Sequence, residues 1–285
     1  MLVRKAERKK AKIRAAIQGP SGSGKTYSSI LLAQGLADDP STICIIDTEF
    51  GSSDLYTDLG EYSVINLKPP FTPESYMEAI TLAEESGFEV IIIDSMSHCW
   101  QYLVEFHASL SGNSFTNWAK IKPRVQALTN KILSSSSHII STFRTKQDYI
   151  LNKKSDVKLV PEKVGMKTIS HEGADYDYTL VFDIDIKHFA NSSKDRTGLF
   201  KDQKDFIITP STGKKIKEWC NIGINKASIL IQIKEVKTLK ELSSLYYKDP
   251  SIGATLSEEF SKRKKALELQ LGKEELMNGI KTEQL

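Results

Sequence analysis

One eight-residue segment near the start of the chain constrains the fold more than any other feature. It reads Gly19-Pro20-Ser21-Gly22-Ser23-Gly24-Lys25-Thr26 and fits the phosphate-binding loop pattern G-x-x-x-x-G-K-[ST]. The preceding segment 13–18 is typical of a strand, and 28–36 has the apolar spacing of a helix packed on a sheet. Glycines let backbone N–H groups turn toward phosphates, and the helix N-terminus adds partial positive charge. We therefore expect Lys25 to neutralise the β- and γ-phosphate oxygens of ATP and the Thr26 hydroxyl to bind Mg²⁺.

The segments after this loop predict an α/β fold with a mostly parallel central sheet flanked by helices, because short apolar runs alternate with helical patterns. Further strands are expected over 42–47, 90–94, 138–142, 178–186 and 205–209, and helices over 74–86 and 118–133. Thr72 is expected to cap the helix at 74–86, with Pro73 at its first position. Pro123 is expected to break the other helix.

The chain is predicted to have three parts. Residues 1–14 carry seven Lys or Arg against Glu7 and form a basic arm, which suits either a solvated tail or contact with nucleic-acid phosphates. Residues 12–222 form the ATPase core. Residues 223–285 are rich in Lys and Glu, with leucines at helical spacing, and predict a helical C-terminal tail.

Composition excludes several classes of protein. No apolar run approaches the ~20 residues that cross a bilayer, and the basic N-terminus lacks the apolar stretch of a secretory signal. Cys44, Cys99 and Cys220 are scattered and show no zinc spacing. We therefore expect a cytoplasmic protein without membrane contact or structural metal.

Two apolar segments end in acidic residues. In a parallel sheet, ligand-binding groups lie at the carboxyl ends of the strands. Val90 to Ile93 leads to Asp94, and this carboxylate is the candidate for a second Mg²⁺ ligand. The earlier segment, 43–46, ends in Asp47-Thr48-Glu49. A solvated acid at a strand end is the alternative for Glu49.

The order of phosphate loop, Asp-x-Glu strand and Asp-Ser strand resembles the RecA-like ATPases. This resemblance implies that Glu49 is the general base that orients the attacking water. It also implies that Thr142 or Ser141, in the next strand, senses the γ-phosphate and signals to DNA-binding loops. Several members of the family carry glutamine there, so Arg144 is a second candidate for this role, and a plain surface arginine is the alternative.

Ser193-Lys194-Asp195-Arg196-Thr197-Gly198 resembles the Lys-x-Arg element that RecA-like hexameric helicases and recombinases insert into a neighbouring ATP site. The resemblance implies that Arg196 is a trans-acting finger with Lys194 as its partner, and hence that the chain forms a homo-oligomeric ring or filament. The segment 94–98 and this element together resemble phage-encoded ATP-binding proteins related to the RecA-type single-strand annealing group, over about residues 10–222. A phage protein in a bacterial host is then expected.

Residues 144–170 hold seven Lys or Arg against three acidic residues and predict a mobile basic loop. In RecA-like proteins the loop after the sensor strand meets DNA, so the resemblance implies a DNA-binding role here. The candidate residues are Arg144, Lys146, Tyr149, Lys153, Lys154 and Lys158. A solvated hairpin is the alternative.

These observations predict an ATPase that acts on single-stranded DNA in phage-type recombination, annealing or replication, with a single-strand DNA-binding protein as a further candidate partner. A hexameric helicase or translocase shares every motif. A small-molecule kinase would need an acceptor-site base and an Arg-rich lid, and a nucleotide-gated scaffold would not need the full catalytic set. His98, His107 and His171 receive no role from the sequence.

Overall fold

The computed structural model describes residues 11–155, 158–201, 203–248 and 256–282, without the side chains of 147–166, 222–228 and 271–282. The chain divides into two compact units, of which the larger is Lys12–Trp219 and the smaller contains Cys220–Leu285. Most of the predicted basic arm lies outside the described residues. Arg14, which the prediction included in the arm, instead lies in the first strand with its side chain buried.

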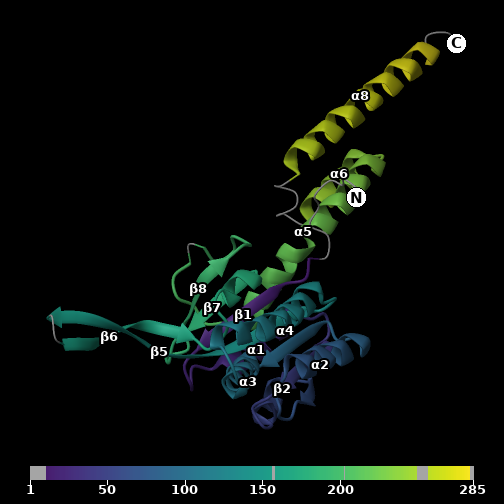
Figure 1. Cartoon of the computed structure of the whole chain (residues 1–285). Helices are drawn as coiled ribbons and strands as arrows, with labels where there is room; N and C mark the ends of the chain where they lie inside the picture. Colours follow the sequence, from purple (N-terminus) through teal and green to yellow (C-terminus); the bar gives the residue numbers. More distant parts are fainter. Residues whose placement is uncertain (1–10, 156–157, 202, 249–255, 283–285) are drawn as a thin grey trace. The chain divides into compact units, whose positions relative to one another are not determined.

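The larger unit is built on one eight-stranded sheet with the order β3-β2-β4-β5-β1-β7-β8, and β6 pairs with β5 (Figure 1). The strands are β1 Arg14–Gly19, β2 Ile43–Asp47, β3 Ser63–Asn66, β4 Val90–Asp94, β5 His138–Ser155, β6 Lys158–Thr168, β7 Leu180–Ile184 and β8 Ala190–Asp195. All neighbours from β3 to β7 are parallel, whereas β8 runs antiparallel to β7. Every residue of β2 and β4 is buried, as expected for strands covered on both faces. The predicted α/β fold with a mostly parallel sheet is confirmed.

Helices cover both faces of this sheet. They are α1 Lys25–Leu36, α2 Pro73–Glu85, α3 Met96–Ser109, α4 Ser114–Ser134 and the first part of α5 Pro210–Glu235. Helices α2, α3 and α4 enclose an apolar cluster on one face, around Tyr76, Ile93 and Ile121. On the other face α1 and α5 approach closely, because a Cβ at Gly35 would collide with Gly213. This crossing explains why both positions are glycine.

Local sequence signals predicted the start of one helix correctly and the course of another incorrectly. Thr72 caps α2 by accepting a hydrogen bond from the N–H of Ser75, as predicted. The predicted break at Pro123 is wrong, because α4 continues through it. A helix-interior proline costs about 3 kcal/mol, whereas three large aliphatic side chains buried on α4 contribute roughly 1.5–3 kcal/mol each. These side chains are Ile121, Leu128 and Ile132.

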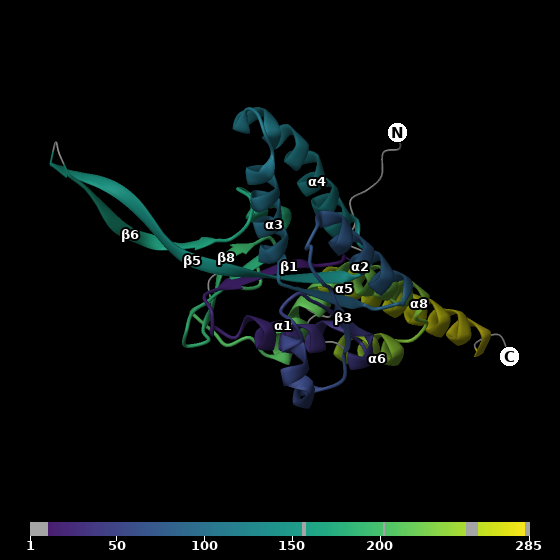
Figure 2. The same cartoon turned by 60° about the horizontal axis from the view of Figure 1, so that its bottom comes forward.

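Two other expectations are corrected. The predicted strand over 205–209 is reduced to a single bridge between Ala190 and Phe206. The predicted mobile basic loop is an antiparallel ribbon, because β5 continues past the sheet and pairs with β6 (Figure 2). Its pairing with β1 ends at Arg144, and its pairing with β6 begins at Thr145.

The smaller unit is helical, as the sequence predicts for the tail. It contains the end of α5, α6 Leu239–Lys248 and α8 Ser257–Thr282. Leu256, Phe260 and Leu267, three residues of the predicted apolar stripe, are buried in its core. The side chain of Leu271, the fourth, lies outside the described part of the chain, as do Pro250 and Gly253, which were predicted to separate two helices. None of the helices in the described ranges combines the length and the apolar character that crossing a bilayer requires.

Candidate functional site

The loop from Gly19 to Lys25 joins the end of β1 to the start of α1, and its backbone demands glycine. Gly24 has a φ of 84°, in the left-handed region that favours glycine. A Cβ at Gly19 would collide with the carbonyl oxygen of Ile184 and lie 2.6 Å from the hydroxyl of Ser23. The sequence thus gives a tight loop at the carboxyl edge of the sheet and at the N-terminus of a twelve-residue helix. This arrangement suits an anion with several oxygens.

Two polar groups of this loop are suited to binding an anion. The Ser23 hydroxyl is buried, and no atom of the described residues hydrogen-bonds to it. The Lys25 ammonium donates to the carbonyl oxygen of Pro20 at 2.8 Å, folded back over the loop. Burial lowers the pKa of Lys25, although Asp94 and Glu49 oppose that shift. A phosphate group in the loop would add negative charge beside this half-buried ammonium, so the residues fit the β- and γ-phosphates of ATP.

Thr26 and Asp94 meet as predicted for the two Mg²⁺ ligands, with the Thr26 hydroxyl 2.5 Å from Asp94 Oδ2. The hydroxyl of Thr142 donates to the other carboxylate oxygen. Asp94 is 3% exposed, and burial raises the pKa of its carboxyl despite these two donors. In the described part of the chain no group of three or more His, Cys, Asp or Glu could hold a metal by itself. This fits Mg²⁺, which is commonly held by one or two protein oxygens together with phosphate and water.

Glu49 lies at the same edge and is held by charged and polar neighbours. Arg144 Nε donates to Glu49 Oε1 at 3.0 Å, and Arg144 Nη2 donates to Oε2. The hydroxyl of Ser95 also donates to Oε1, at 3.2 Å. Both carboxylate oxygens are therefore engaged, and Arg144 is a partner of the predicted base rather than a plain surface residue.

A buried hydrogen-bond network that the sequence analysis missed fixes the segment carrying Glu49. Asp47, buried, accepts hydrogen bonds from the N–H of Glu49 at 2.6 Å and from the hydroxyl of Ser53 at 2.5 Å. The hydroxyl of Thr48 accepts from the N–H of Ser95 and lies 2.8 Å from His98 Nδ1. His98 Nε2 is 4.0 Å from Glu49 Oε1, and burial lowers the pKa of His98. The role of His98 was not readable from the sequence, because the side chains that it contacts are about fifty residues away.

Lys194 and Arg196 do not join this group. Because β8 is antiparallel to β7, Asp195 pairs with Leu180, and Arg196 then follows at the edge of the sheet opposite the phosphate loop. Lys194 Nζ donates to the carbonyl oxygen of Asp175 at 2.5 Å, and Arg196 Nη2 donates to that of Tyr176 at 3.2 Å. The exposed Arg196 is too far along the sheet to reach the loop of its own chain.

The candidate DNA residues follow β5 into the ribbon. Lys146 is exposed near its base. Tyr149, Lys153, Lys154 and Lys158 lie on the ribbon itself, where the backbone pairing is described and the side chains are not.

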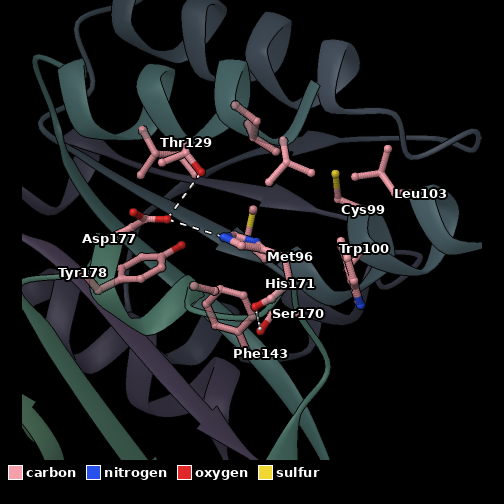
Figure 3. Close-up of a pocket in the computed structure, with 14 residues that line it drawn as sticks. Met96, Cys99, Trp100, Leu103, Thr129, Phe143, Ser170, His171, Asp177 and Tyr178 are labelled. Carbon is pink, nitrogen blue, oxygen red and sulfur yellow. Dashed lines mark hydrogen bonds and ion pairs between the residues drawn. The ribbon is translucent and has the colours of Figure 1, made fainter. Parts of the chain in front are cut away.

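A separate small cavity lies between α3, α4 and the segment 170–178, and its lining is mainly apolar (Figure 3). Its volume of about 40 Å³ has room for a few water molecules and excludes a nucleotide. At its polar end Asp177 accepts a hydrogen bond from Thr129 at 3.4 Å and lies 3.6 Å from His171 Nε2. His171 thus has a structural partner.

Comparison with known proteins places the larger unit in a family. The model of the family described as an AAA domain matches residues 11–212. No curated protein matches the chain. Among solved structures, the chain is similar to a KaiC-like protein from the hyperthermophilic archaeon Pyrococcus horikoshii, with 15% identity and a TM-score of 0.42. That similarity covers 72% of this chain and 87% of the archaeal one.

Proposed function

The chain belongs to the AAA domain family, and from that premise we propose that it is a Mg²⁺-dependent ATPase of RecA-like type that acts on single-stranded DNA. One observation carries the nucleotide part of the proposal. Thr26, which follows Lys25 at the end of the phosphate loop, contacts the buried carboxylate of Asp94, and this combines an anion cradle with a cation site. ATP with Mg²⁺ satisfies both at once.

The residues divide the work of hydrolysis. The loop amides and Lys25 bind the β- and γ-phosphates, and Thr26 and Asp94 hold Mg²⁺, which when bound offsets negative charge on the phosphates. Glu49 accepts the proton of the attacking water, and therefore it must first release Arg144. Thr142 keeps Asp94 oriented through its hydrogen bond.

We also propose that a second copy of the chain completes the ATP site. Arg196 is exposed, charged and distant from the loop of its own chain, so any ATP site that it serves belongs to a neighbouring subunit. A guanidinium offered in this way stabilises the charge on the transferring phosphoryl group. Such sharing requires a ring or filament.

The basic ribbon is the proposed contact with single-stranded DNA. It extends from the strand that carries Thr142 and Arg144, and its sequence has an excess of positive charge suited to a phosphate backbone. We propose that the protein acts in phage-type recombination, strand annealing or replication. A single-strand DNA-binding protein is its proposed partner there.

The test is steady-state ATP hydrolysis by the full chain with and without single-stranded DNA. We expect Mg²⁺-dependent turnover that DNA stimulates, and no turnover in Lys25→Ala. Replacement of Lys153, Lys154 and Lys158 together should leave basal turnover intact and remove stimulation at moderate salt. Stimulation that persists in this triple variant would exclude the ribbon as the DNA site, and wild-type protein without turnover would refute the ATPase itself.

A further inference from the structure

The turn between β7 and β8 touches the phosphate loop at two places. At the first, the carbonyl oxygen of Ile184, the last residue of β7, lies against Gly19. At the second, His188 lies over Gly24, where an added Cβ would be 3.1 Å from Nδ1. The turn therefore borders both ends of the loop, although some 165 residues separate the two segments.

His188 makes a directed contact with the loop. Its Nδ1 lies 3.0 Å from the carbonyl oxygen of Ser23, and a carbonyl oxygen only accepts hydrogen bonds. Nδ1 must therefore carry the proton and donate it. The imidazole fixes the direction of the Ser23 carbonyl group.

That direction determines where a loop amide points. The C=O of Ser23 and the N–H of Gly24 belong to one trans peptide unit, so the two groups point in opposite directions. With the carbonyl held toward His188, the Gly24 N–H faces away from the turn. Loop amides turned inward in this way make an anion cradle.

The turn is itself rigid, and His188 adopts a backbone conformation that few residues accept. Asp185 Oδ1 accepts hydrogen bonds from the N–H groups of Lys187 at 2.8 Å and Phe189 at 2.9 Å. The N–H of His188 donates to the carbonyl oxygen of Asp185. His188 has a φ of 69°, and non-glycine residues held in this region cluster at functional sites.

We propose that His188 is a positioning residue for the phosphate loop, which orients the Ser23–Gly24 peptide so that its N–H receives the phosphates of the nucleotide. The inference rests on the proposed ATP site and names a residue that completes it. Because His188 acts through the loop, it affects every ligand that fills the cradle, whatever base the ligand carries.

The test compares two variants that both tolerate a positive φ. His188→Gly removes the donor, whereas His188→Asn places an amide nitrogen at the position of Nδ1 and keeps it. Affinities for ATP, ADP and inorganic tripolyphosphate are measured by calorimetry on the full chain. We expect His188→Gly to weaken all three by a similar factor of about two to ten, the value of one hydrogen bond, and His188→Asn to stay within about twofold of wild type.

Unchanged affinities in His188→Gly, or an equal loss in His188→Asn, would overturn the proposal. A loss for ATP and ADP without one for tripolyphosphate would also overturn it, because the effect would then lie at the base. Lys25→Ala is measured in parallel. If the wild type binds none of the three ligands, the ATP site itself is refuted. If the wild type binds them and His188→Gly binds them with the same affinity, this inference alone fails. Should His188→Gly not fold, His188→Asn is compared with His188→Ala, which removes the donor without adding a charge.

Discussion

Replacing Arg144 by alanine tests whether the ion pair with Glu49 restrains hydrolysis. The pair occupies both oxygens of the carboxylate that is proposed to accept the proton from water. Glu49 must leave Arg144 before it can act, and the free energy of that step adds to the barrier. We expect Arg144→Ala to hydrolyse ATP faster than wild type in the absence of DNA.

The geometry sets the size of the effect. Hydrogen bonds to charged groups contribute roughly 1.5–3 kcal/mol when they are well shielded, and exposed ion pairs about 0.2–1 kcal/mol. The Arg144 side chain is 39% exposed and that of Glu49 is 23% exposed, so solvent screens the pair considerably. A value of about 1 kcal/mol is therefore appropriate, and it corresponds to an increase of about fivefold in the basal rate.

The assay is steady-state hydrolysis at saturating ATP, with and without single-stranded DNA, for wild type, Arg144→Ala and Arg144→Lys. Arg144→Lys keeps the charge but loses the paired geometry, so its basal rate should fall between the other two. If DNA acts by releasing Glu49, it should stimulate Arg144→Ala less than wild type. A lower basal rate in Arg144→Ala would refute the reasoning, because Arg144 would then assist the reaction rather than restrain it.

Three further predictions address the remaining parts of the site and the fold. Glu49→Gln should bind ATP with Mg²⁺ normally but hydrolyse it about 10²–10⁴-fold more slowly, whereas Asp94→Asn should weaken Mg²⁺-dependent binding in a titration as well as turnover. Arg196→Ala should bind ATP, fail to hydrolyse it alone, and regain activity when mixed with Glu49→Gln subunits; absence of rescue in verified mixed assemblies would contradict a shared site. Burial lowers the pKa of His138 from 6.5 to about 3, and its Nδ1 accepts the N–H of Ile13. The folded chain therefore binds this proton less tightly than the unfolded chain. As the pH falls from 6.5 to about 3, the free energy of unfolding should fall by roughly 1.4 kcal/mol per pH unit. In denaturant titrations over this pH range, the free energy of unfolding of His138→Asn should depend less on pH than that of wild type. An unchanged pH dependence would show that His138 does not titrate as stated.

The parts of the site that were predictable from sequence are those set by local chemistry. The phosphate loop has glycines where its backbone requires them and lies between a strand and a helix, so eight consecutive residues define it. Asp94 ends a five-residue strand that is buried throughout, and this apolar run is readable in the sequence. Parallel strands then bring their carboxyl ends to one edge, which explains why Thr26 meets Asp94 across 68 residues.

The parts that were not predictable depend on contacts between residues that are far apart in the sequence. Arg144 is an ordinary cation after a strand until β2 and β5 bring it to Glu49, 95 residues away. The ribbon was expected to be a loop because its residues are polar and charged. The apolar alternation that marks a strand is weak in this part of the sequence, and the ribbon is defined by the backbone pairing of β5 with β6.

The position of Arg144 in β5 gives the proposed coupling a structural basis. β5 pairs with β1 up to Arg144, opposite Gly19 of the phosphate loop, and from Thr145 onward it pairs with β6. Arg144 is thus the last residue of β5 that pairs with β1, and it adjoins the ribbon. Arg144 adjoins the ribbon, whereas Thr142, two residues earlier, is buried and donates a hydrogen bond to Asp94. DNA bound to the ribbon could then displace the partner of Glu49 without disturbing the carboxylate proposed to hold Mg²⁺.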